Sequence, residues 1–269
     1  MTIPSTARKA VFITGAAAGI GRATALTFAR NGFVVGGYDI DEVGLKSLAD
    51  EIDQLGGVAH TGHLDVTDPD EMATRVREFA EAAGDRLDVM INNAGILRAG
   101  RFEEMDVAGH HKEIDINVKG IVNGLYAAFP YLRKTPNSVV VNLSSASAIY
   151  GQAELANYSA TKFFVRGITE ALDIEWNRYG IRVIAMWPLY VQTAMTHDIK
   201  TGTTDSLGIR LKAQDIADAI VEATEPSRLR RMIHQVHFPV GTQTKVMTIA
   251  SRFSPGWLTR YANKKLSHS

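Results

Sequence analysis

The 269-residue chain contains no cysteine, which excludes disulfides, zinc–thiolate sites, iron–sulfur clusters and cysteine nucleophiles. Its formal net charge is zero, with 29 basic and 29 acidic residues, so no overall field favours nucleic acid. The sequence has no apolar run long enough for a membrane-spanning helix. Residues 1–9 also lack the apolar core of a signal peptide. These absences predict a cytoplasmic protein that does not bind nucleic acid.

Acidic residues are missing from one part of the chain. The last one is Glu225, and the 44 residues that follow carry eight Lys or Arg. The first 225 residues are therefore acidic overall. Apolar residues make up 45% of the chain and charged residues 22%, as in ordinary globular proteins. An acidic body joined to a basic C-terminal segment therefore needs an explanation beyond composition.

A glycine-rich turn lies near the N-terminus. An apolar run at 10–14 is followed by the turn 15–21, an Ala-rich helix ending near Arg30, and a second apolar run at 33–38 that ends in Asp39. Small residues let a backbone approach a pyrophosphate, and the helix N-terminus supplies N–H donors. Asp39 can accept hydrogen bonds from a ribose, and its charge would repel a 2′-phosphate, so NAD is favoured over NADP. The alternative is a tight turn that binds nothing.

The same alternation of strands and helices continues along the chain. Further strands are expected at 58–64, 87–91, 138–143, 181–187 and 232–240. Further helices are expected at 42–55, 68–83, 109–131, 158–178 and 214–224. This pattern predicts an α/β fold, with one Rossmann-type domain and a doubly wound, mostly parallel seven-stranded sheet with helices on both faces. The domain spans residues 1–240, residues 241–269 form a C-terminal extension, and the loop 196–207 is placed to act as a substrate lid.

One helical stretch carries a candidate for proton transfer. Tyr158 and Lys162 are four residues apart, so they share a helix face. A tyrosine with an ordinary pKa of about 10 is a poor acid–base group at neutral pH. A nearby ammonium favours the phenolate and would lower that pKa. The spacing is common by chance and usually marks a solvated helix face.

Several short motifs together make the sequence resemble the short-chain dehydrogenases/reductases over about residues 8–240. In chain order the motifs are Thr14-Gly15-x-x-x-Gly19-Ile20-Gly21, Asp65-Val66, Asn92-Asn93-Ala94-Gly95, Asn117, Ser145 and Tyr158-x-x-x-Lys162. The resemblance implies an NAD(P)-dependent oxidoreductase that forms a homodimer or homotetramer. One departure from the family pattern is Pro188-Leu189, where the family usually has Pro-Gly.

The resemblance also implies roles for individual residues. The catalytic group would be Asn117, Ser145, Tyr158 and Lys162. Tyr158 would exchange the substrate proton, Lys162 would lower its pKa and hold the nicotinamide ribose, and Ser145 would bond the substrate oxygen. Asn117 would hold a water that links Lys162 to solvent. The non-catalytic alternatives are that Ser145 only caps a turn and that Asn117 is structural.

Cofactor contacts are expected from the glycine turn, the strand ends and the catalytic helix. These residues are Gly15, Gly19, Ile20, Gly21, Asp39, Asp65, Val66, Asn92, Ala94, Gly95, Tyr158, Lys162, Pro188, Val191 and Thr193. By family analogy, Asp65 and Val66 lie near the adenine and Asn92 near the adenosine ribose. Thr193 lies near the carboxamide or the pyrophosphate.

The segment after the sixth strand indicates the kind of substrate. It is rich in apolar side chains and methionine, with Met186, Trp187, Leu189, Tyr190 and Met195. We therefore predict hydride transfer between NAD(H) and a small-molecule, hydrophobic secondary alcohol or ketone. Two other functions stay open, namely a catalytically silent NAD-binding regulator and a membrane-surface enzyme with a lipid-like substrate.

Histidine pairs and the basic C-terminal segment are weaker signals. The pairs are His60 with His63, His110 with His111, and His234 with His237; their members point apart, so no metal site is expected. His197 is the histidine that could face a substrate. The segment interleaves apolar and basic side chains, namely Ile249, Phe253, Trp257, Leu258 and Tyr261 with Lys245, Arg252, Arg260, Lys264 and Lys265. Packing on its own domain or a neighbouring subunit is favoured over membrane contact, and Pro255-Gly256 should interrupt any helix there.

Overall fold

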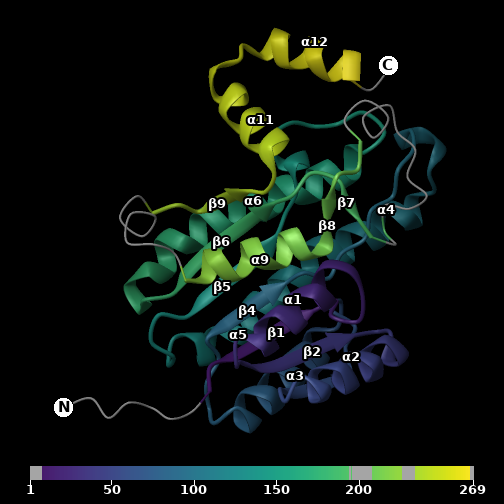
Figure 1. Ribbon diagram of the computed structural model, residues 1–269. Helices are drawn as coiled ribbons and strands as arrows, with labels where there is room; N and C mark the ends of the chain where they lie inside the picture. Colours follow the sequence, from purple (N-terminus) through teal and green to yellow (C-terminus); the bar gives the residue numbers. More distant parts are fainter. Residues whose placement is uncertain (1–7, 194, 196–207, 226–233, 267–269) are drawn as a thin grey trace.

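A seven-stranded parallel sheet forms the centre of the protein, in a computed structural model that describes residues 8–193, 195, 208–225 and 234–266 (Figure 1). The strand order is β3-β2-β1-β4-β5-β6-β9. The strands are β1 (Ala10–Thr14), β2 (Val34–Asp39), β3 (Val58–His63), β4 (Val89–Asn92), β5 (Val139–Leu143), β6 (Arg182–Trp187) and β9 (His237–Pro239). Two short strands, β7 (Val191–Gln192) and β8 (Leu211–Lys212), pair separately. The predicted single Rossmann-type domain is confirmed.

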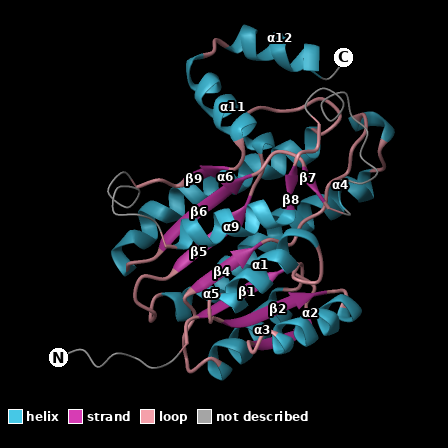
Figure 2. Cartoon of the chain, viewed as in Figure 1, coloured by secondary structure: helices cyan, strands magenta, loops and turns pink. Residues whose placement is uncertain are grey.

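Helices cover both faces of the sheet (Figure 2). One face packs against α1 (Gly19–Arg30), α2 (Glu42–Gln54) and α9 (Ala213–Thr224), and the other against α3 (Pro69–Ala82), α5 (Gly120–Leu132) and α6 (Ala156–Trp176). Strand β1 shows why two cores form. Val11 and Ile13 enter the first core, whereas Ala10 and Phe12 enter the second, because successive strand residues point to opposite faces.

Helix caps set where several helices begin. The Asp41 carboxylate accepts from the Gly44 N–H and opens α2, and Asp68 does the same for α3 with the N–H groups of Asp70 and Glu71. Helix α1 has no side-chain cap and no acid in its first turn. Its N–H groups therefore remain available to a ligand at the carboxyl edge of the sheet.

The segment predicted as one helix at 109–131 is divided. It consists of α4 (Val107–Ile114), a π-helical turn at Asp115–Lys119, and α5. The buried Asn117 lies in that turn and bonds the backbone at Ile96, a long-range contact that helical periodicity cannot reveal. The part of the predicted strand 232–240 that the structure describes contains β9. The predicted lid 196–207, with His197, lies outside the described residues.

Two helices follow the sheet. They are α11 (Thr242–Phe253) and α12 (Gly256–Leu266), and they extend from the β9 end of the sheet (Figure 1). Pro255 lies between them, where the sequence predicted an interruption. No helix among the described residues combines the length and apolar character needed to cross a membrane.

Candidate active site

The glycine turn after β1 brings its own backbone segments into close contact. Gly15 and Gly19 have φ angles of 68° and 54°, which side-chain-bearing residues rarely adopt. A Cβ atom on Gly21 would lie 2.0 Å from the Gly15 carbonyl oxygen. The turn therefore requires glycine and leaves the start of α1 uncovered. This cradle of N–H groups at a helix N-terminus fits a dinucleotide pyrophosphate.

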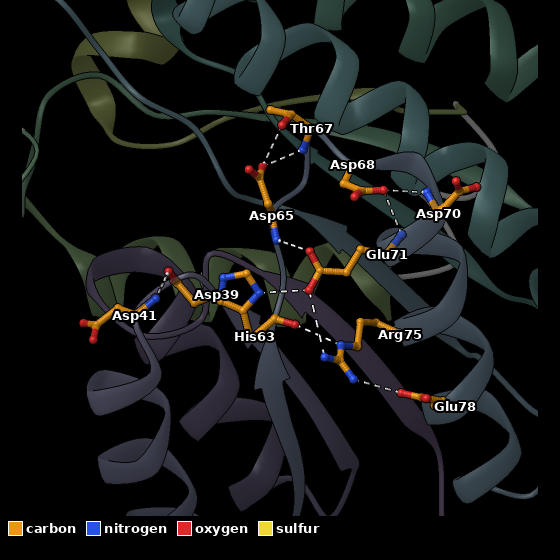
Figure 3. A network of polar contacts seen from close by, with 10 residues as sticks. All are labelled: Asp39, Asp41, His63, Asp65, Thr67, Asp68, Asp70, Glu71, Arg75 and Glu78. Atoms are coloured by element: carbon orange, nitrogen blue, oxygen red, sulfur yellow. Dashed lines mark hydrogen bonds and ion pairs between the residues drawn. The ribbon is translucent and has the colours of Figure 1, made fainter.

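Asp39 is held rigidly beside this turn. Its Oδ2 atom accepts from the Ala17 N–H at 3.0 Å, and its Oδ1 atom accepts from the Asp41 N–H at 3.1 Å. At the end of the neighbouring strand, the Asp65 carboxylate accepts from the backbone and side chain of Thr67 at 2.9 and 2.8 Å (Figure 3). These carboxylates make the edge of the cavity acidic.

The arginine in this polar network, Arg75, already has acidic partners. Arg75 pairs with Glu78 at 3.1 Å and with Glu71 at 3.9 Å, and its Nε donates to the His63 carbonyl (Figure 3). The hydrogen bond that the Glu71 carboxylate accepts from His63 also raises the pKa of His63. The charge of Arg75 is thus balanced by acids on its own helix, and it does not neutralise Asp39.

Tyr158, Lys162 and Ser145 meet at the carboxyl end of β5. All three are buried. Ser145 follows β5 and caps the next turn by accepting from the Ser147 N–H at 3.1 Å, which was the alternative to a catalytic role. It also lines the cavity. The Lys162 Nζ atom donates to the Leu143 carbonyl at 2.9 Å and lies 5.4 Å from the centre of the Tyr158 ring.

Burial dominates the protonation of this pair. It raises the pKa of Tyr158 far above its usual value; a hydrogen bond to Ser145 acts against this, and the charge of Glu113 adds to it. Burial also lowers the pKa of Lys162 to about 8, with Glu113 opposing. The expectation that Lys162 lowers the pKa of Tyr158 is therefore not met in this structure, where the ammonium is directed at a backbone carbonyl.

Asn117 joins two parts of the site. Its Oδ1 atom accepts from the Ile96 N–H and its Nδ2 atom donates to the Ile96 carbonyl, both at 2.8 Å. The Nδ2 atom also donates to Thr161 on α6 at 3.2 Å. Asn117 thus ties the loop after β4 to the helix that carries Tyr158. A π-turn at this point agrees with the frequent placement of such turns at functional sites.

A cavity of about 670 Å³ unites most of the predicted residues. Its walls include Gly15, Gly19, Ile20, Asp39, Asp65, Val66, Ala94, Gly95, Ser145, Tyr158, Lys162, Pro188, Val191 and Thr193. The predicted residues that do not line the cavity are Gly21, Asn92 and Asn117. The Asn92 side chain is buried and donates to Asn142 at 2.9 Å, while Asn93 lines the cavity.

Sequence reasoning missed two polar residues of the site. Glu113 is fully buried and accepts from the Arg98 N–H at 3.0 Å and from the Asn157 side chain at 2.7 Å. Gln152 is also buried, lines the cavity, and accepts from Tyr190 at 3.5 Å. Glu113 sits in a helix next to the exposed His111 and Lys112, and Gln152 in an irregular segment, so neither had a periodic signal.

The structure also shows where the turn at Leu189 and several of the histidines lie. Leu189 lines the cavity and is not among the described residues with positive φ, so leucine fits the turn where the family has glycine. His63 pairs with Glu71 and His237 with Glu170, at 2.9 and 2.7 Å. Within the described part of the chain, no three His, Asp or Glu residues gather to hold a metal ion.

Comparison with known proteins gives consistent matches. The family model for short chain dehydrogenases matches residues 9–204. The chain is 35% identical over 219 residues to a 3-oxoacyl-(acyl-carrier-protein) reductase of Thermotoga maritima, covering 79% of this chain and 89% of that one. It is 32% identical over 188 residues to a cyclohexanol dehydrogenase of an Acinetobacter species, covering 70% and 74%. Carveol dehydrogenase of Mycobacterium avium in complex with NAD superposes with a TM-score of 0.78 at 26% identity, covering 87% and 96%.

Proposed function

The chain belongs to the short-chain dehydrogenase family, and from that premise we propose that it transfers a hydride between NAD(H) and a hydrophobic secondary alcohol or ketone. One observation carries the proposal. The glycine turn that fits a pyrophosphate and the buried pair Tyr158 and Ser145 line the same cavity. The nicotinamide cofactor, when bound, supplies the hydride, and the protein supplies placement and proton handling.

Tyr158 is the proposed acid–base group. In reduction it gives a proton to the carbonyl oxygen, and in oxidation it takes the alcohol proton. Its raised pKa keeps the free enzyme in the protonated form, ready to donate. Ser145 would hydrogen-bond the same oxygen as negative charge develops there. We assign Lys162 to holding the nicotinamide ribose, and Asn117 to fixing the backbone and the helix on either side of it.

Asp39 supports NAD(H) rather than NADP(H). Its carboxylate is fixed by two backbone N–H groups beside the glycine turn. A ribose can donate hydroxyl groups to it, whereas a 2′-phosphate would place like charges together. Arg75, the cation in this network, is paired with Glu71 and Glu78.

The cavity walls support a compact apolar substrate with a polar end. Ile96, Leu97, Leu189 and Met195 supply apolar surface. Gln152 adds an amide group. The similarity to a cyclohexanol dehydrogenase agrees with such a shape. We therefore propose cyclic secondary alcohols and ketones as the first substrates to test.

The test is NADH oxidation with a panel of cyclic and linear ketones, with Tyr158→Phe as the variant. We expect turnover to fall by about 10²–10⁴-fold, the usual contribution of a general acid–base group, with NADH binding retained. Tyr126→Phe is the matched control, because Tyr126 is 85% exposed on α5 and does not line the cavity. NADH binding without turnover of any carbonyl would instead identify a silent dinucleotide-binding protein.

A further inference from the structure

On helix α11 the side chains turned toward the domain are mostly polar, and the large exposed side chains are mostly apolar. Thr244 is fully buried, and Thr248 and Ser251 are partly buried. On the other side, Ile249 and Phe253 are 63% and 84% exposed. In a helix packed on a globular body the apolar stripe faces the core. Here the hydroxyl side chains are turned to the domain together with the partly buried Met247, whereas Val246, Ile249 and Phe253 are exposed.

Helix α12 repeats this arrangement. Thr259 and Asn263 are partly buried, and the Asn263 amide donates to the Gly151 carbonyl of the domain. Trp257 and Tyr261, four residues apart on one face, are 71% and 63% exposed. A hydrogen bond from Asn263 thus ties the helix to the body, while Trp257 and Tyr261 are exposed. Large apolar side chains left exposed on two successive helices mark an interaction site.

The charge of this surface identifies its partner. The exposed side chains of Lys245, Arg260, Lys264 and Lys265 accompany the apolar ones, and no acidic residue follows Glu225 in the sequence. Aromatic and aliphatic residues flanked only by cations are typical of helices that lie in the headgroup region of anionic membranes. Self-association of this face about a two-fold axis would instead bring two sets of cations together.

We propose that α11 and α12 form an amphipathic platform that docks on an anionic lipid surface. The platform comprises the apolar residues Val246, Ile249, Phe253, Trp257, Leu258 and Tyr261 and the four cations above. Docking buries the apolar stripe at the headgroup boundary and places the cations among lipid phosphates. This proposal does not depend on catalysis, since none of the platform residues lines the active-site cavity.

The platform is also tied to the rim of the active site. Gly151, which accepts from Asn263, directly precedes Gln152 in the cavity wall. A lipid surface against α12 therefore lies beside the substrate end of the cavity. An apolar substrate dissolved in the membrane would reach the enzyme without crossing bulk water.

The test is co-sedimentation of the full-length protein with vesicles of phosphatidylcholine alone or with added phosphatidylserine. We expect binding to the anionic vesicles, with affinity reduced about tenfold or more by the double substitution Phe253→Ser and Trp257→Ser. Lys264→Glu with Lys265→Glu should weaken binding by a similar factor, about tenfold, and high salt should do the same. Val43→Ser is the matched control, because Val43 is 82% exposed on α2.

The outcomes are distinct. Binding that depends on charge and on the two aromatic residues, and is unchanged by V43S, supports the platform. A lack of binding to any vesicle, or equal binding by the aromatic variant, overturns it. Sedimentation velocity on the same proteins tests the alternative that a second copy of the chain covers this face. If the double substitution dissociates an oligomer without changing vesicle binding, a second copy covers the face, and the lipid proposal is wrong.

Discussion

Replacing Asp39 by asparagine should change cofactor preference without disturbing the fold. The Asp39→Asn side chain keeps an oxygen that can accept from the Ala17 N–H, now at 3.0 Å, but loses the negative charge. Two unit charges about 4 Å apart repel by about 4 kcal/mol at an effective dielectric constant of about 20. Asp39 is partly exposed and solvent screens the charge, so we take about half of that value, about 2 kcal/mol, as the penalty on a 2′-phosphate. Removing it should raise kcat/KM for NADPH about 30-fold.

The same substitution should weaken use of NADH. A hydrogen bond to a charged group contributes about 1 kcal/mol more than a neutral one, so kcat/KM for NADH should fall about fivefold. The combined shift in the NADPH/NADH ratio is about a hundredfold. Initial rates with both cofactors and one ketone measure it.

The control is Asp41→Asn, which makes the same charge change two residues away. Asp41 is exposed and keeps its cap on Gly44 through a side-chain oxygen. This variant should leave the cofactor ratio near that of the wild type. An unchanged ratio in the Asp39 variant, or a wild-type enzyme that prefers NADPH, would refute the reasoning.

Further predictions concern the buried titratable groups and two glycines. Burial lowers the pKa of Lys162 from 10.5 to about 8, so between these pH values the unfolded chain binds more protons than the folded one. The free energy of unfolding should therefore rise by about 2–3 kcal/mol from pH 8 to 10. Urea denaturation measures this rise, which the Lys162→Met variant should lack. Above pH 10 the raised pKa of Tyr158 should reverse the trend. Gly21→Ala should destabilise by about 2 kcal/mol or more, because its Cβ meets a carbonyl at 2.0 Å. Gly167→Ala in α6, with no atom within 4 Å of the new Cβ, should stabilise by about 0.5–1 kcal/mol in the same assay. Glu113→Gln should move the pH–rate profile to lower pH, because Glu113 raises the pKa of both Tyr158 and Lys162; an unmoved profile would contradict this.

Periodicity was enough to predict the sheet and its helices. Buried parallel strands are continuous apolar runs, and Val139–Leu143 shows this with all five residues buried. The π-turn was not predictable, since it depends on the bonds of Asn117 to Ile96, which is 21 residues away. Local patterns identify elements but not the contacts that distort them.

For the site, the sequence indicated several residues but not their burial or their pKa values. The family resemblance implied that Ser145 and Tyr158 act together, and both line one cavity at the carboxyl edge of the sheet. The raised pKa of Tyr158 could not be foreseen, because the i, i+4 rule gives proximity but neither burial nor the direction of the ammonium. Glu113 was missed for the same reason, since burial of a helical acid depends on the helices packed around it.

The turn at Asp115–Lys119 also makes the enzyme sensitive to chain length at one point. Each residue of an α-helix advances the chain by about 100°, since there are about 3.6 residues per turn. Deleting one residue here would let α4 and α5 fuse into a regular helix and would rotate everything upstream by about that angle. Asn117 would then lose Ile96, although α5 kept its packing. A single-codon deletion in this turn could thus silence the enzyme while leaving its fold intact.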